Sequence, residues 1–259
     1  MSPDTDRQPP AAAGQPQDEE GRSKRSLALL GFVSLFLTIV LLGLGTWQVQ
    51  RLGWKLDLIA RVDARVAAAP VSPPNRDGWG AITADADEYR HVTVSGIFQH
   101  EKEALVQAST ERGPGFWVIT PLIQVDGTRI LVNRGFVPPD RRAVESRTEG
   151  NGAGIQTVTG LLRLTEPGGG FLRSNVPAED RWYSRDVAAI AASRGLRDVA
   201  PYFIDADATP NAGGYPIGGL TRVVFPNNHL VYAITWFSLA AMLAAATVII
   251  GRREWRRAV

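Results

Sequence analysis

The sequence contains no cysteine among its 259 residues. Disulfides, thiolate catalysis, zinc ribbons, iron–sulfur clusters and copper–thiolate sites are therefore excluded within this chain. Histidine is scarce too, since only His91, His100 and His229 occur. His91 and His100 lie around one expected strand and its exit, at a spacing that does not place two metal ligands on one face. We expect both to be exposed or hydrogen-bonded strand side chains.

Recognisable enzyme motifs and strong charge are also missing. The formal net charge is +2, and no long run of Lys or Arg marks a face for nucleic acid. The sequence has no phosphate-binding P-loop, no GxGxxG after a strand, no GxSxG and no HExxH. We therefore expect neither a nucleic-acid-binding protein nor an enzyme.

Two long segments lack any charge. Residues 27–47 (LALLGFVSLFLTIVLLGLGTW) and 230–250 (LVYAITWFSLAAMLAAATVII) each run for 21 uncharged residues. At about 1.5 Å per residue each helix would be about 30 Å long, which is the thickness of a bilayer core. We predict two transmembrane helices. Gly43-Leu44-Gly45 resembles a signal-peptidase site, but signal-peptide cores are only about 7–15 residues long.

The spans divide the chain. Residues 1–26 are polar and predicted to be disordered, 48–229 form an extramembrane domain, and 251–259 form a basic tail. The tail carries four arginines, whereas residues 210–229 contain only Arg222. The positive-inside rule then places both termini in the cytoplasm. The domain would face the periplasm of a bacterial inner membrane, or the equivalent outer space of an organelle. Basic residues flank the first span on both sides, so this prediction rests on the second span.

The domain between the spans is rich in short β-type runs. Asp126-Gly127 separates two of them and indicates a hairpin. A helix is expected over 184–195, with Ser184 as its cap and Gly195 at its end. The predicted strands are 89–99, 103–109, 115–124, 128–137, 155–164, 201–207 and 221–225. The fold class is therefore two transmembrane helices flanking a mostly antiparallel β (α+β) domain, barrel-like or sandwich-like.

Polar and aromatic residues gather where the first span ends and the second begins. Trp47, Arg51 and Trp54 share one helical face, and Gln48 and Lys55 share the adjacent face. His229, Tyr232 and Trp236 share a face at the start of the second span. If the two helices are neighbours, these residues lie at a similar depth.

An aromatic belt at the lipid head groups accounts for most of these aromatics, but less well for Gln48 and His229. The positive end of a helix dipole disfavours imidazolium, so we expect His229 to be neutral. A neutral imidazole with aromatic and cationic neighbours suits a haem: nitrogen to iron, rings against the porphyrin, and Arg51 or Lys55 to the propionates. His229 is thus the candidate metal ligand. Trp47, Gln48, Arg51, Tyr232 and Trp236 complete the candidate haem site.

Three motifs in order resemble the surfeit locus protein family. They are GTWQVQRLGWK after the first span, ILVNRGFVP in the hairpin, and PNNHLVYAITWF opening the second span. The family often has Trp where Phe136 stands. The resemblance implies a non-enzymatic assembly factor for haem–copper cytochrome c oxidase that helps haem a reach subunit one. It also implies that His229 contacts the haem, and that haem a synthase is a further partner beside the lipid bilayer.

Two functions remain open on this basis. One is a haem a carrier or insertion factor. The other is a haem-independent chaperone that stabilises the oxidase core subunit. Copurified haem a would separate them.

Overall fold

The computed structural model describes residues 24–170 and 172–258. The chain divides into two compact units. One contains the described residues of Met1–Gly53 and Asn227–Val259, and the other is Trp54–Pro226. Most of the N-terminal segment that we expected to be disordered, residues 1–23, lies outside the described residues.

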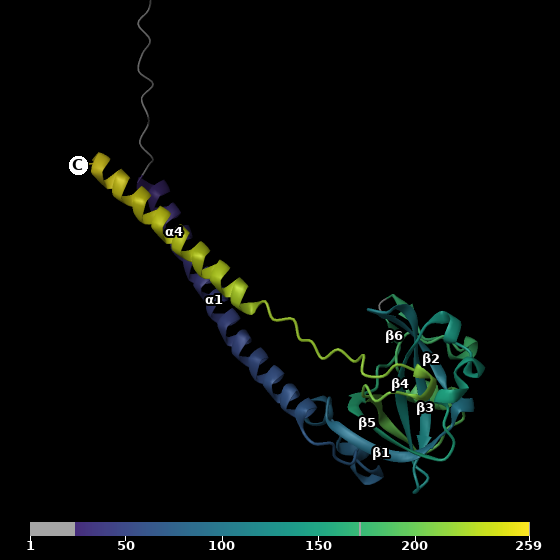
Figure 1. Ribbon diagram of the computed structural model, residues 1–259. Coiled ribbons are helices and arrows are strands. Elements are labelled where there is room, and N and C mark those ends of the chain that lie inside the picture. Colours follow the sequence, from purple (N-terminus) through teal and green to yellow (C-terminus); the bar gives the residue numbers. More distant parts are fainter. Residues whose placement is uncertain (1–23, 171, 259) are drawn as a thin grey trace, which may run out of the picture. The chain divides into compact units, whose positions relative to one another are not determined.

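Two long helices, α1 (Lys24–Ala67) and α4 (His229–Ala258), contain the two uncharged segments (Figure 1). Both are long and apolar enough to cross a membrane. Residues 24–26, which we expected to be disordered, already belong to α1. The helix also continues 20 residues past the predicted span, because residues 48–67 contain no proline and only Gly53 as a glycine. It ends shortly before Pro70.

The apolar helices pack antiparallel, as three contacts along their length show. The hydroxyls of Ser34 and Thr247 are hydrogen-bonded near one end. Gly45 lies against the ring of Phe237, and Gln48 bonds His229 near the other end. Small residues at such contacts let helix backbones approach closely, which is how apolar helices associate in lipid.

The second unit is built on one six-stranded sheet with the order β1-β5-β8-β4-β3-β2. Residues Ile97 and Phe98 of β1 also pair with β3, which closes the sheet into a barrel. Only β4 and β8 run parallel, so the predicted mostly antiparallel, barrel-like domain is confirmed. The strands are β1 (His91–Phe98), β2 (Ala104–Thr110), β3 (Gly113–Ile123), β4 (Arg129–Val137), β5 (Ile155–Leu164) and β8 (Val199–Ala206).

Short elements fill the connections. The helices are α2 (Ala84–Asp87) and α3 (Val187–Ser193), and β6 (Gly169–Gly170) pairs with β7 (Arg173–Ser174). The 3-10 segments are η1 (Arg76–Ala81), η2 (His100–Lys102), η3 (Pro139–Arg141), η4 (Val144–Gly150), η5 (Pro177–Glu179) and η6 (Ala212–Gly214).

Apolar side chains on successive strand residues point to opposite faces and form two separate cores. On β4, Ile130 and Val132 join a cluster that also contains Tyr202. Leu131, which points to the opposite face, joins a second cluster with Trp182. Successive strand residues point to opposite faces, so the barrel buries apolar side chains on both.

Two local predictions were wrong in part. Residues 221–225 form no strand, because β1, β5, β8, β4 and β3 already pair with one another in a ring. The helix expected over 184–195 is shorter, and Asp186 caps it by accepting a bond from the N–H of Ala189 at 3.0 Å. Ser184 instead donates to the carbonyl of Glu166 at 2.6 Å. Gly195, with φ +60°, follows the helix end as expected.

The predicted hairpin at Asp126-Gly127 is confirmed. Gly127 has φ +83°, a conformation that glycine adopts without strain. The Asp126 carboxylate accepts bonds from the hydroxyl and N–H of Thr128, and these bonds lower the pKa of Asp126. The turn thus sets the register of β3 and β4.

Candidate functional site

A polar pair joins the two apolar helices near the start of α4. His229 Nδ1 lies 2.7 Å from Gln48 Oε1, across a separation of 181 residues. Gln48 is only 9% exposed, and His229 is half-buried. A buried amide is costly unless it is hydrogen-bonded, so each side chain stabilises the burial of the other. The condition on which the candidate site depends, that the two helices are neighbours here, is therefore met.

The partner of His229 determines which ring nitrogen carries the proton. A carbonyl oxygen can only accept, so Nδ1–H is the donor to Gln48 Oε1. In the neutral ring the lone pair then belongs to Nε2, the nitrogen that a metal would bind. Histidine ligands usually donate their other N–H to an acceptor in this way, which orients the ring.

The two asparagines before His229 have different roles. The Asn228 carbonyl accepts a bond from the Tyr232 N–H at 3.2 Å, so Asn228 holds the N-cap position of α4. The Asn227 Oδ1 is buried and has no hydrogen-bond partner among the described residues. Our sequence reasoning gave Asn227 no role. An unpaired polar atom two residues before His229 makes it a further candidate to contact a bound group.

The other predicted site residues lie on the same two helices, and their side chains are more exposed than that of Gln48. Trp47 is 54% exposed and Tyr232 is 53% exposed. Arg51 is exposed and Trp236 is half-buried. The structure thus brings Gln48 and His229 together, while the roles of Trp47, Arg51, Tyr232 and Trp236 remain predictions.

Lys55 and Trp54 follow on α1 and belong to the barrel unit. The Lys55 ammonium lies 4.9 Å from the centre of the Phe225 ring, and that ring also meets Tyr89 edge-on. Within its own unit Lys55 is therefore engaged in a cation–π contact.

His100 is hydrogen-bonded as expected, because its Nδ1 accepts from Arg134, but it lies in a 3-10 helix and not in a strand. It lies in η2, its Nε2 is buried with no hydrogen-bond partner among the described residues, and Arg134 Nη1 approaches its Nδ1 at 3.3 Å. Burial lowers the pKa of His100, and the positive Arg134 lowers it further. Burial also lowers the pKa of Arg134, to about 10. His91 is hydrogen-bonded as expected, through Nδ1 to the carbonyl of Ala68 at 2.7 Å.

The donor set fits a haem better than a bare metal ion. Within the described part of the chain, no three His, Asp or Glu side chains gather as a metal-binding group. A porphyrin supplies four nitrogens itself, so one neutral imidazole is enough to attach it to a protein. His229, held by Gln48 with its Nε2 lone pair available, meets this requirement.

These features define a class of membrane-anchored protein in which two apolar helices flank a small β-barrel domain. The SURF1 family model matches residues 35–241, and the chain belongs to the SURF1 family. It is 39% identical to surfeit locus protein 1 of Homo sapiens over 233 residues, covering 83% of this chain and 75% of the human protein.

Other relatives show similar agreement. Surfeit locus protein 1 of Rattus norvegicus is 40% identical over 230 residues, covering 83% of this chain and 73% of the rat protein. A SURF1-like protein of Monosiga brevicollis is 36% identical over 237 residues, covering 86% and 88% respectively.

Proposed function

We propose that this protein is an assembly factor for haem–copper cytochrome c oxidase that binds haem a and aids its delivery to subunit one. Two lines support the proposal. Membership of the SURF1 family supports the proposed role in assembly, and the hydrogen bond between Gln48 and His229 supports the proposed binding of haem. The second line comes from the fold, because it depends on two residues that only helix packing brings together.

Each site residue has a distinct part in this proposal. His229 binds the iron through Nε2, and Gln48 holds the ring in the required tautomer. The rings of Trp47, Tyr232 and Trp236 lie against the porphyrin, and Arg51 pairs with a propionate. Haem a is cargo in this scheme, so the site must release it as well as bind it. A half-buried position at a helix end serves both requirements.

The proposed setting follows from the two helices. By the positive-inside rule, the four tail arginines support a cytoplasmic end of α4, and we propose that the barrel domain faces the periplasm of a bacterial inner membrane. The relatives named above are eukaryotic, so the equivalent outer space of an organelle is the alternative setting for this proposal. Oxidase subunit one is the proposed partner, and haem a synthase is a further one.

The test is purification in mild detergent from cells that make haem a, followed by an absorption spectrum and pigment extraction. We expect His229→Ala to lose most of the bound haem a while the protein stays inserted and abundant. Gln48→Leu should lower haem affinity about 10–100-fold, the usual effect of removing a partner of a metal ligand. Gln50→Leu, on the exposed side of the same helix, is the matched control.

Arg51→Ala should have a smaller effect, because a propionate pair near water is screened. We expect a loss on the order of 1 kcal/mol. His91→Gln serves as the histidine control, because His91 bonds the chain at an exposed position of the barrel unit. His100→Ala should also keep its haem, but His100 is half-buried, so that variant is not neutral for folding.

Two results would contradict the haem proposal. One is a full and unshifted haem spectrum for His229→Ala. The other is wild-type protein that never carries haem a yet still supports oxidase assembly, which would favour the haem-independent chaperone.

A further inference from the structure

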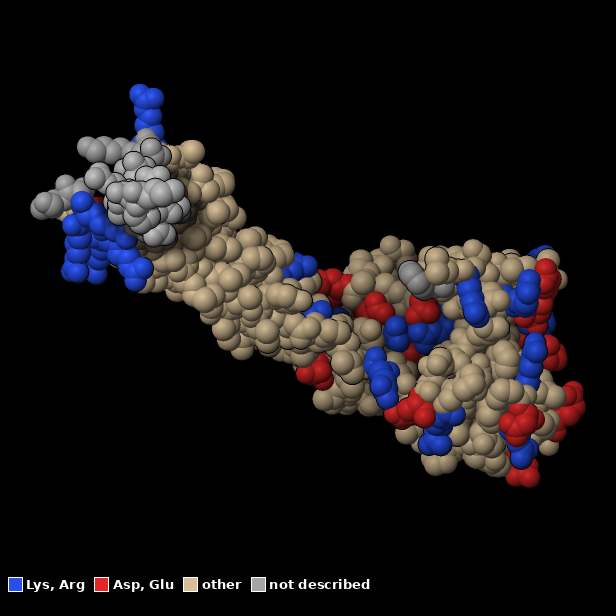
Figure 2. Space-filling view, turned by 90° about the horizontal axis from the view of Figure 1, so that it is seen from above, with Lys and Arg blue, Asp and Glu red and all other residues tan. Residues whose placement is uncertain are grey.

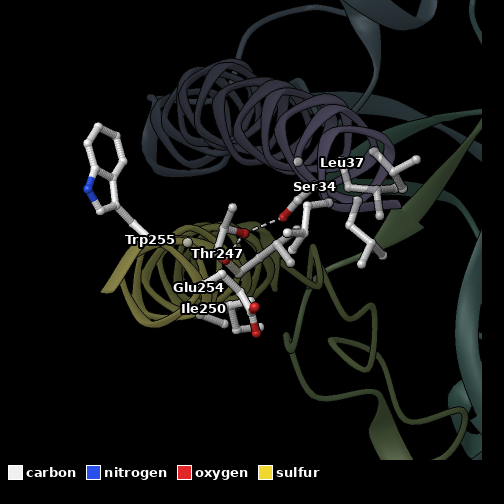
Figure 3. Close-up of a pocket in the computed structure, with 13 residues that line it drawn as sticks. Ser34, Leu37, Thr247, Ile250, Glu254 and Trp255 are labelled. Atoms are coloured by element: carbon white, nitrogen blue, oxygen red, sulfur yellow. Dashed lines mark hydrogen bonds between the residues drawn. The ribbon is translucent and has the colours of Figure 1, made fainter. Parts of the chain in front are cut away.

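A second feature of the helix pair lies at the opposite end from His229. There α1 and α4 enclose an apolar groove of about 690 Å³ (Figure 3). Leu30 and Leu37 of α1 and Leu243 and Ile250 of α4 are among its lining residues. The groove therefore suits a hydrocarbon chain.

The hydroxyls inside the groove are already hydrogen-bonded, and Glu254, which also lines the groove, pairs with Arg257 at 3.7 Å. The hydroxyls of Ser34 and Thr247 point toward one another and are hydrogen-bonded (Figure 3). Thr247 also bonds the carbonyl of Leu243 at 2.8 Å, so the pair needs no polar ligand. A ligand gains here by burying apolar surface and not by forming new hydrogen bonds.

Positive charge surrounds the same end of the helix pair. Figure 2 shows Lys and Arg side chains gathered there, beyond a long stretch of helix without charge. The described arginines are exposed: Arg25 on α1, and Arg252, Arg253, Arg256 and Arg257 on α4. The one described carboxylate among them is Glu254, 3.7 Å from Arg257. Five arginines against one glutamate attract an anion.

The groove and the charge lie along one face of α4. Leu243, Ile250 and Arg257 follow each other at seven-residue steps, so they share a helical face. Trp255 also lines the groove, and an indole of this kind prefers the layer of lipid head groups. One molecule with an apolar chain and an anionic head can therefore occupy both parts at once.

We propose that this end of the helix pair binds an anionic phospholipid, with an acyl chain in the groove and its phosphate among the arginines. The positive-inside rule explains the arginines alone, and general lipid contact explains an apolar surface alone. Their juxtaposition on one face selects an anionic lipid over a neutral one. The proposal does not depend on haem binding.

The test uses the full chain in nanodiscs and lipids brominated on their acyl chains, which quench nearby tryptophans. The protein has seven tryptophans, so the Trp255 signal is taken as the difference between wild type and Trp255→Phe. Brominated phosphatidylglycerol should quench Trp255 at a several-fold lower mole fraction than brominated phosphatidylcholine. Arg256→Gln with Arg257→Gln should remove most of that preference.

A substitution that fills the groove provides a second test of the proposal. Gly31 lines the groove, and a Cβ added there meets no atom within 4 Å, so Gly31→Leu adds apolar bulk to the groove wall from a position with open space. We expect it to abolish the preferential quenching. Gly43→Leu is the matched control, since Gly43 also has open space but does not line the groove.

Three outcomes would overturn the proposal. Equal quenching by both lipids means bulk lipid contact only. Preferential quenching that survives Gly31→Leu means that the arginines act without the groove. Absence of quenching by either lipid means that something other than phospholipid covers the groove, such as a second copy of the chain, which cross-linking would reveal.

Discussion

Gly45 of α1 lies directly against the ring of Phe237 of α4. A Cβ placed on Gly45 would be 2.6 Å from that ring, well inside van der Waals contact. Gly45 is one helical turn before Gln48, so this contact helps to set the distance between the helices at the candidate haem site. On α4, the small residues Ala233 and Ala240 are buried too, each 2% exposed.

Gly45→Leu should therefore separate the helices, at a cost of about 1–3 kcal/mol for overpacking. The chain has no cysteine, so Ser34→Cys with Thr247→Cys gives a clean disulfide reporter of helix pairing. We expect slower cross-linking in Gly45→Leu and an unchanged rate in Gly43→Leu, because a Cβ at Gly43 meets no atom within 4 Å. Equal rates in both would show that the close approach is not required.

Asp205 holds together the buried polar cluster of the barrel. Its carboxylate accepts bonds from Asn133 at 2.7 Å, Arg163 at 3.0 Å and Arg185 at 3.1 Å, and its side chain is 1% exposed. Asp205→Ala leaves two guanidinium groups without this partner, which should cost about 3–5 kcal/mol.

The measurement is the free energy of unfolding in urea, with the protein in detergent and tryptophan fluorescence as the signal that monitors unfolding. Asp140→Ala is the control, because the Asp140 side chain is 78% exposed and lies 4.0 Å from Arg141. That variant should change stability by less than about 0.5 kcal/mol. Similar values for the two variants would contradict a structural role for the cluster.

His100 makes stability depend on pH. Its pKa is lowered below the ordinary value of 6.5, chiefly by burial and then by Arg134. The unfolded chain therefore binds the proton more readily than the folded chain. The neutral ring contributes fully to the stability of the folded chain above pH 6.5. This contribution is lost as the pH falls toward the lower pKa that His100 has in the folded chain.

We expect the unfolding midpoint of the wild type to fall between pH 7.5 and pH 5, and His100→Gln to flatten this dependence. The pKa values of the Asp126 and Glu166 carboxyl groups are lowered from ordinary values that are already acidic. These two groups therefore affect stability at lower pH than His100 does. An unchanged slope in His100→Gln would assign the dependence to other groups.

The topology can be tested with single cysteines. Val125 is 94% exposed at the β3–β4 hairpin, so Val125→Cys should react from outside the cell with a membrane-impermeant maleimide. Arg253→Cys, in the tail, should react only after lysis. Labelling of Arg253→Cys in intact cells would reverse the proposed orientation.

The sequence alone was enough for features that depend on neighbouring residues. Two uncharged runs of 21 residues identify the apolar helices because a bilayer requires that length. Asp126-Gly127 identifies the hairpin because glycine adopts the required positive φ. Alternation of apolar and polar residues identified six of the strands, because successive side chains of a strand point to opposite faces. The position of His229 at the start of the second helix also followed from counting along the chain, whereas Gln48 lies in the middle of α1, which continues to Ala67.

Tertiary structure decided whatever depends on which segments meet. Residues 221–225 have the pattern of a strand, yet the barrel closes through β1 and β3 and leaves them outside the sheet. Asp186, not Ser184, caps α3, because Ser184 meets Glu166. His100 is half-buried, and its Nδ1 bonds Arg134, which lies 34 residues away in the sequence. The tautomer of His229 depends on Gln48, 181 residues away, and periodicity within a single helix contains no information about that partner.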